Sequence, residues 1–145
     1  MLMRDVSDIR RRDRMLLSKD ATIREIHHRV KNNLQTIAAL LRLQGRRLTS
    51  EEAKEALAES ERRIRAIAIV HETLSREARE FVDFGQIVKP LVRVVEESVS
   101  TGDGGLRFEV VGDAGELPGE LATPLAVVLN ELMQNAVDQI GRAHV

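Results

Sequence analysis

The sequence predicts a mainly α protein, in which an antiparallel helical hairpin is followed by the incomplete start of an α+β domain. Three observations support this fold class. Between Ile9 and Leu48 there is no proline and the single glycine is Gly45. Apolar residues in that stretch recur every seven positions, which is typical of a helix packed against another helix. After residue 80 the pattern changes to helix, strand and helix.

The first helix is expected over residues 9–48. A helix that carries apolar rows at seven-residue spacing leaves them in water when it stands alone, so we expect a partner helix. The upstream part has polar companions and predicts a thin coiled coil. The two rows are Ile9, Leu16, Ile23, Val30 and Ile37, and His27, Leu34, Leu41 and Leu48.

A second helix is expected from Thr49 or Ser50, either of which can act as N-cap together with Glu52, to about Ala78. The connection to the first helix is only a few residues long, which forces an antiparallel hairpin. One hairpin exposes too much apolar surface, so a homodimer that forms a four-helix bundle is expected. The residues expected to face inward are Leu57, Ile64, Ile67, His71 and Leu74.

The remaining chain predicts three more elements. Asp83 is expected to cap a helix that Pro90 either kinks or delays. The turn-rich stretch 101–105 precedes a predicted strand at 106–110, which alternates in polarity. Thr123 and Pro124 are expected to begin a last helix that ends near Asp138. One strand cannot form a sheet, so this part is expected to be incomplete.

Composition narrows the function classes. The 145 residues carry a net charge of -1 with no tyrosine or tryptophan, which argues against a nucleic-acid-binding protein. The absence of cysteine excludes disulfides and thiolate metal sites. No apolar run is long enough for a membrane span, and no signal peptide is seen. We expect a soluble protein of the cytoplasm.

Residues 25–35, EIHHRVKNNLQ, contain two adjacent histidines. Neighbours on a helix point in directions about 100° apart. His27 lies on the row that faces the hairpin, whereas His28 lies on a polar stripe with Lys31 and Asn32. A solvent-facing imidazole is a nucleophile that is largely neutral near pH 7. Residue pattern alone leaves three interpretations open, namely a reactive His28, a passive solvated face or, less favoured, a zinc site.

Residues 25–47, EIHHRVKNNLQTIAALLRLQGRR, together with IVHETLS (69–75), resemble the second histidine-kinase dimerisation (HisKA) family, which is related to the HWE kinases. The resemblance implies that His28 accepts the γ-phosphoryl group of ATP, with His27 as the reserve candidate. It also implies phosphoryl transfer to the receiver domain of a response regulator. Arg24, Lys31 and Arg42 would steer that acidic partner, and Asn32 is assigned a role in dephosphorylation.

LNELMQNAV (129–137) resembles a helix of the GHKL-type ATP-binding fold. By this resemblance Asn135 and Glu131 bind the nucleotide, Asn135 through Mg²⁺. Glu131 would act as general base or would orient the attacking group. The glycine-rich boxes that complete such an ATP site are missing from the sequence. The alternative is therefore a non-catalytic phosphotransfer or dimerisation module that needs a kinase in trans; a purely structural coiled coil is a second rival.

The resemblance covers roughly residues 20–138 and suggests a division of the chain. Residues 1–19 resemble the end of a PAS-like sensor domain, with a last strand that leads into a signalling helix. Residues 20–80 would form the dimerisation and phosphoacceptor hairpin, and residues 81–138 the first part of the ATPase domain. Residues 140–145 read as the translation of a common sequencing-library adapter. We therefore expect a non-native tail at 139–145, in which His144 has no role.

Overall fold

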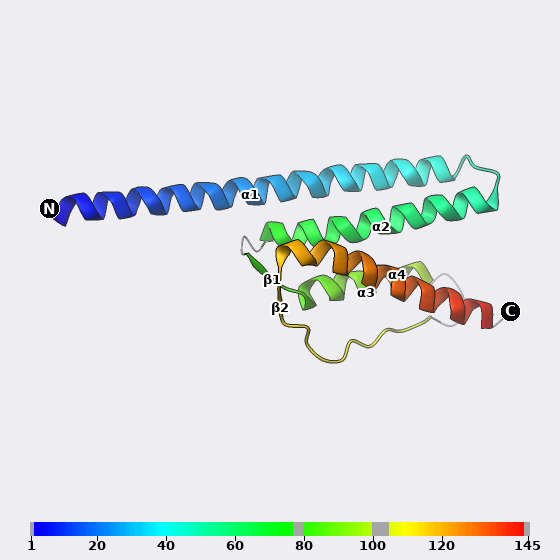
Figure 1. Ribbon diagram of the computed structural model, residues 1–145. Coiled ribbons are helices and arrows are strands. Elements are labelled where there is room, and N and C mark those ends of the chain that lie inside the picture. Colours follow the sequence, from blue (N-terminus) through cyan, green and yellow to red (C-terminus); the bar gives the residue numbers. More distant parts are fainter. Residues whose placement is uncertain (1, 77–79, 100–104, 144–145) are drawn as a thin grey trace.

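The computed structural model describes residues 2–76, 80–99 and 105–143. Four helices and two short strands make up the described fold. Figure 1 shows α1 and α2 running antiparallel, with α2 between α1 and the pair formed by α3 and α4. The elements are α1 (Leu2–Gly45), α2 (Glu51–Arg76), β1 (Phe81–Asp83), α3 (Gly85–Val99), β2 (Glu116–Pro118) and α4 (Gly119–Ala143).

The predicted antiparallel hairpin is confirmed. Its turn is closed by backbone hydrogen bonds, in which Arg47 N–H donates to the Gln44 carbonyl over 3.0 Å. Of the two candidate caps, Ser50 is used, because its Oγ accepts a hydrogen bond from Ala53 N–H at 3.3 Å. This bond satisfies one of the amide groups left without partners at a helix start. α2 ends at Arg76, and the predicted end near Ala78 lies outside the described residues.

The hydrophobic core lies between α2, β1, α3 and α4 rather than inside the hairpin. α1 contributes one buried apolar residue, Ala38, and its remaining described residues are half-buried or exposed. The hairpin therefore uses one face of α2 for α1 and another face for the core. The largest fully buried side chains are Ile87, Leu91, Val70, Val82 and Val95.

The predicted strand at 106–110 is wrong, because this segment is irregular. Alternating polarity makes a strand only where another strand offers hydrogen bonds, and among the described residues no strand lies beside it. Phe108 is held instead by α3, since its N–H donates to Glu96 Oε1 at 2.9 Å. The sheet that does form pairs β1 with β2 in antiparallel register, Val82 opposite Leu117.

The start of α4 differs from the predicted one. α4 begins at Gly119, four residues before Thr123, so Pro124 lies inside the helix. The earlier start buries Ala122 completely, and Gly119 N–H donates to the Glu80 carbonyl at 2.9 Å. Tertiary packing thus outweighs the proline signal. α3 begins at Gly85 and contains Pro90, so of the two effects expected of this proline, a kink or a late start, the late start is wrong.

Asp83 caps α3 as predicted, because its Oδ1 accepts a hydrogen bond from Gly85 N–H at 2.9 Å. Residues 2–13 are helical throughout, which corrects the expected strand at that end. One seven-residue row of α1 continues upstream to Leu2, whereas the other has Asp20 and Asp13 at its upstream positions. The PAS-like assignment of residues 1–19 and the foreign origin of 139–145 stay predictions, although α4 extends through Ala143. Within the described segments, no helix combines the length and apolarity that crossing a membrane requires.

Candidate functional site

The two adjacent histidines have different environments, as predicted. His28 is exposed on α1, whereas His27 is half-buried against α2. The Nδ1 atom of His27 lies 3.0 Å from Nδ1 of His71 on α2, within hydrogen-bonding distance. The two ring centroids are 5.2 Å apart and the rings are tilted by 38°. The outer imidazole is thus accessible to a reactant, and the inner one is part of the helix interface.

Burial lowers the pKa of His27. The pKa of His71 is lowered by burial first, and secondly by the positive charge that His27 can carry. Both shifts favour neutral rings near pH 7. A neutral pair can share one hydrogen bond, with one Nδ1 donating and the other accepting. Among the described side chains no group of three or more histidine, aspartate or glutamate residues is placed to hold a metal ion.

The face around His28 is polar. Lys31 and Asn32 follow His28 by three and four residues and therefore lie on its side of the helix. Lys31 is half-buried and Asn32 is exposed. Arg29 pairs with Glu25 at 3.2 Å on the exposed surface. Lys31 thus places a positive charge one helical turn from the candidate nucleophile.

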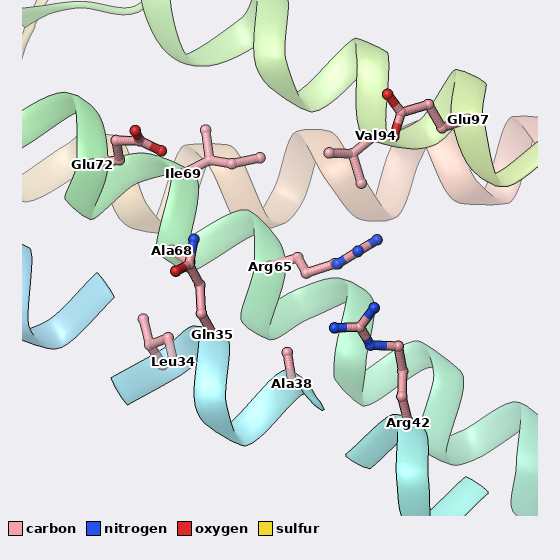
Figure 2. A pocket seen from close by; sticks show the side chains of 10 residues that line it. All are labelled: Leu34, Gln35, Ala38, Arg42, Arg65, Ala68, Ile69, Glu72, Val94 and Glu97. Atoms are coloured by element: carbon pink, nitrogen blue, oxygen red, sulfur yellow. The ribbon is translucent and has the colours of Figure 1, made fainter. Parts of the chain in front are cut away.

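A pocket of about 320 Å³ opens beside the hairpin, between α1, α2 and α3. Figure 2 shows Gln35 and Arg42 of α1 opposite Val94 and Glu97 of α3. Gln35 follows His28 by seven residues, so the pocket opens on the same side of α1 as His28. The pocket is partly polar, and Arg42 Nε at one end pairs with Glu61 at 3.1 Å.

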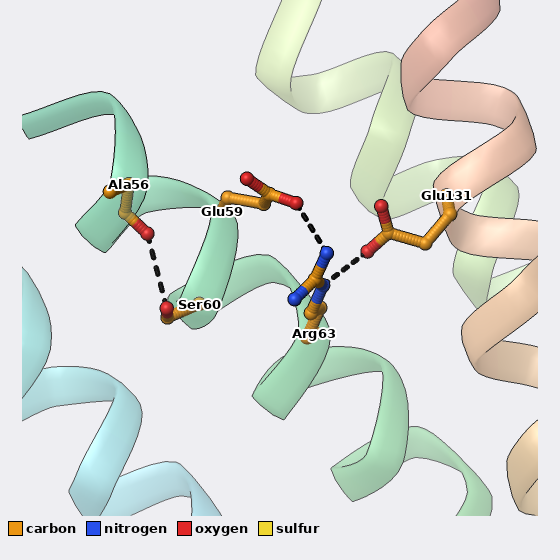
Figure 3. Close-up of polar contacts among 5 residues, drawn as sticks. All are labelled: Ala56, Glu59, Ser60, Arg63 and Glu131. Atoms are coloured by element: carbon orange, nitrogen blue, oxygen red, sulfur yellow. Dashed lines mark hydrogen bonds and ion pairs between the residues drawn. The ribbon is translucent and has the colours of Figure 1, made fainter. Parts of the chain in front are cut away.

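On α4, Glu131 and Asn135 are four residues apart and share a face. Figure 3 shows Arg63 of α2 between two carboxylates. Its Nε donates to Glu131 Oε1 at 2.5 Å, and its guanidinium nitrogen Nη2 donates to Glu59 Oε1 at 2.5 Å. The hydrogen bond and the charge of Glu131 raise the pKa of Arg63, with a further contribution from Glu59. Glu131 is therefore bound to the hairpin, while Asn135 is exposed.

The predicted site residues do not converge on one point. His28 and Asn32 lie on α1, whereas Glu131 and Asn135 lie on α4, and α2 separates these two helices in Figure 1. The Arg63 contact was not anticipated, because it joins residues 68 positions apart and α2 has neighbouring arginines that fit as well.

The His27–His71 contact could have been predicted from the spacing of the two histidines in the sequence. Each of the two histidines lies 22 residues from Thr49 in the turn, and an antiparallel hairpin brings such positions to the same level.

Comparison with known proteins decides the family. Residues 25–99 match the HisKA_2 family model, described as Histidine kinase. The chain belongs to the histidine kinase family. It is 54% identical over 138 residues to "Sensor histidine kinase PdtaS" of Mycolicibacterium smegmatis and 51% identical to the protein of that name in Mycobacterium tuberculosis H37Rv. These alignments cover 95% of the chain, which spans only about 27–28% of the length of these relatives. No solved structure matches the chain significantly.

The segment matched to the histidine kinase family contains the adjacent pair His27 and His28, the whole of α2 and α3, and none of α4. The predicted family and the helical hairpin are therefore shown. The assignment of α4 to a GHKL-type ATP-binding fold stays a prediction, as do the roles of individual residues.

Proposed function

We propose that this chain is the phosphoacceptor and dimerisation part of a sensor histidine kinase, with His28 as the residue that receives the phosphoryl group. The observation that carries this proposal is the exposure of His28 within the segment matched to the histidine kinase family. His27, the other candidate, is hydrogen-bonded to His71 at the interface of α1 and α2. Of these two candidates, His28 is the one that presents an imidazole to an incoming nucleotide without a change in the hairpin.

The proposed reaction is a transfer from ATP to a ring nitrogen. The lone pair of the unprotonated nitrogen attacks the γ-phosphorus, and the bond to ADP breaks with its electron pair on ADP. The proton on the other ring nitrogen is then released. In the second step an aspartate carboxylate of a response regulator attacks the phosphorus, the N–P bond breaks with its electron pair on the ring nitrogen, and the ring regains a proton from water. Phosphoryl transfer depends mainly on positioning and charge neutralisation, and Lys31 supplies positive charge next to His28.

The ATP-directed role proposed for α4 requires a rearrangement. Asn135 is exposed, and its amide oxygen suits Mg²⁺, which accepts single protein ligands alongside phosphates and water. Bound Mg²⁺ would neutralise phosphate charge. Glu131 fits less well, because Arg63 holds its carboxylate against α2. For Glu131 to orient the attacking group or accept a proton, the Arg63 contact must open and α4 must approach His28.

A second copy of the chain would cover the face of α1 that exposes apolar side chains. Ile37 follows His28 by nine positions, which places the two residues on opposite faces of the helix. The face around Ile37 carries large apolar side chains, each 38–55% exposed, which we call the apolar row. Pairing two such rows would form the four-helix bundle and leave both His28 rings outside it. The apolar row consists of Ile23, Ile26, Ile37, Leu40 and Leu43.

The proposed partner is the receiver domain of a response regulator, which would dock on the His28 side of the hairpin. Arg24 and Lys31 form no ion pair among the described residues and remain available to an acidic surface. Arg42 is less available than expected, because Glu61 neutralises it. Steering by Arg24, which is exposed, and Lys31, which is half-buried, should therefore weaken as salt is added.

One experiment separates the kinase from its alternative, a phosphotransfer module that needs a kinase in trans. The 145-residue chain is incubated with radiolabelled ATP and Mg²⁺, with and without an intact kinase of the same family. Acid-labile label in the chain alone would support self-phosphorylation. The position of Glu131 favours label only when the intact kinase is present. No label under either condition would contradict both functions.

A further inference from the structure

The His27–His71 pair lies where the hairpin ends and α1 continues alone. α2 ends at Arg76, whereas α1 extends upstream from His27 to Leu2, as Figure 1 shows. Every side chain of α1 described before His27 is exposed except Asp20, which is half-buried. Two polar side-chain contacts join α1 to α2 in the described helices. One is Arg42–Glu61 near the turn, and the other is the histidine pair at the open end.

His27 and His28 are consecutive, so any rotation of α1 about its axis turns both rings by the same angle. When His27 points at His71, His28 points to solvent. A rotation that releases His27 brings His28 toward a different neighbour. The histidine bond has a defined direction, whereas the neighbouring apolar residues Val30 and Leu34 are half-buried and cannot form directional side-chain bonds.

We propose that the His27–His71 hydrogen bond is a positioning contact that fixes the rotation of α1 so that His28 faces solvent, and that it is lost when both rings are protonated. The link to phosphorylation rests on the function proposed for His28. With one neutral ring, an Nδ1 lone pair can still accept a hydrogen bond. With two imidazolium rings, both Nδ1 atoms carry protons and two positive charges face each other over 3.0 Å.

The surrounding charges do not replace the bond. On α1, Arg24 and Lys31 lie about one turn from His27, and as cations they have no acceptor for a hydrogen bond from a protonated ring. On α2, Glu72 next to His71 is hydrogen-bonded to Arg76 at 3.0 Å. Neither α3 nor α4 contributes a charge that shifts the pKa of either ring, since the causes are burial and the other histidine. The pair therefore responds to pH as a two-ring unit.

The test follows the exposure and titration of each histidine in the full 145-residue chain. Carbethoxylation by diethylpyrocarbonate, mapped by tandem mass spectrometry, measures how accessible each neutral ring is. NMR titration of the ring protons measures protonation. In the wild-type chain at pH 8, His28 should react much faster than His27. The NMR signals of His27 and His71 should titrate together, below the ordinary histidine value and in two steps.

Two variants separate bonding from titration. His71→Leu fills the space but cannot bond, so the ratio of His28 to His27 modification should fall by about fivefold, the population change expected for one hydrogen bond. His71→Gln offers an amide that can bond to His27 Nδ1 but does not titrate. It should keep the ratio at pH 8 and also keep it at acid pH, where the wild-type ratio declines. Glu72→Gln, next to the pair, is the matched control and should behave as wild type.

Independent titration of His27 and His71 near pH 6.5 would overturn the proposal, as would an unchanged modification ratio in a folded His71→Leu chain. Circular dichroism checks folding of each variant. Phosphoramidate, a small phosphoryl donor that reacts with imidazoles, is used in parallel. If it fails to label His28 while the carbethoxylation pattern holds, the positioning contact stands and the proposed phosphoacceptor role fails.

Discussion

Two neighbouring imidazoles serve different purposes because a helix turns about 100° per residue. The ring of His28 is exposed to water, whereas the ring of His27 lies within hydrogen-bonding distance of His71. The different environments of the two histidines could be predicted from the sequence, since His27 lies on an apolar row and His28 lies on a polar stripe. The Glu131–Arg63 pair could not be predicted, because it depends on how α4 packs against α2.

The histidine pair predicts how stability depends on pH. The folded pKa values of His27 and His71 are lowered, so the unfolded chain binds more protons just below the ordinary value of about 6.5. Stability is therefore fully present above pH 6.5 and is lost as the pH falls through the lowered folded values. Urea unfolding at pH 8, 6.5 and 5 measures this loss.

A chain with both His27→Gln and His71→Gln should lose less stability over the same pH interval, because glutamine does not titrate. His28→Gln is the matched control and should follow the wild-type curve. Equal slopes in the wild-type and double-variant chains would show that the pair has no part in the pH dependence.

At the scale of elements, the two halves of the chain differ in how well the sequence predicts them. The prediction of the hairpin is correct, because the regular spacing of apolar residues and the Ser50 cap act within a single helix. The strand at 106–110 and the start of α4 were wrong because both depend on distant partners. β1 and β2 pair across more than 30 residues of sequence, and each strand has only three residues. Such short strands carry little periodicity of their own.

Core packing of α3 predicts a large effect of a single substitution. Leu91 of α3 is 1% exposed and belongs to the core that α3 forms with α2 and α4. Leu91→Ala removes apolar contacts and leaves a cavity, which should lower the free energy of unfolding by about 2–5 kcal/mol. Urea denaturation followed by circular dichroism measures the change.

Leu132→Ala on α4 is the control, because Leu132 is 60% exposed. Its effect should remain within about 0.5 kcal/mol. A comparable loss in both variants would mean that the core does not lie between α2, α3 and α4.

For the whole molecule, the amount of apolar surface left on α1 predicts self-association. The apolar row has no partner within one chain, and exposed rows of this size favour an interface. Sedimentation should show a dimer. Ile26→Lys together with Leu40→Lys should shift the chain to monomer by placing charges in the seam.

Gln35→Lys adds a lysine on the opposite face of α1 and should leave the dimer intact. A monomeric wild-type chain, or dissociation by Gln35→Lys alone, would contradict the assignment of the apolar row to the dimer seam.

The central claim concerns the one imidazole that α1 presents to solvent. The most direct measurement is the site of acid-labile phosphate after incubation of the chain with radiolabelled ATP and an intact kinase of the same family. The account predicts label on the wild-type and His27→Gln chains and none on His28→Gln. Label that survives in a folded His28→Gln chain, or that disappears only with His27→Gln, would contradict it.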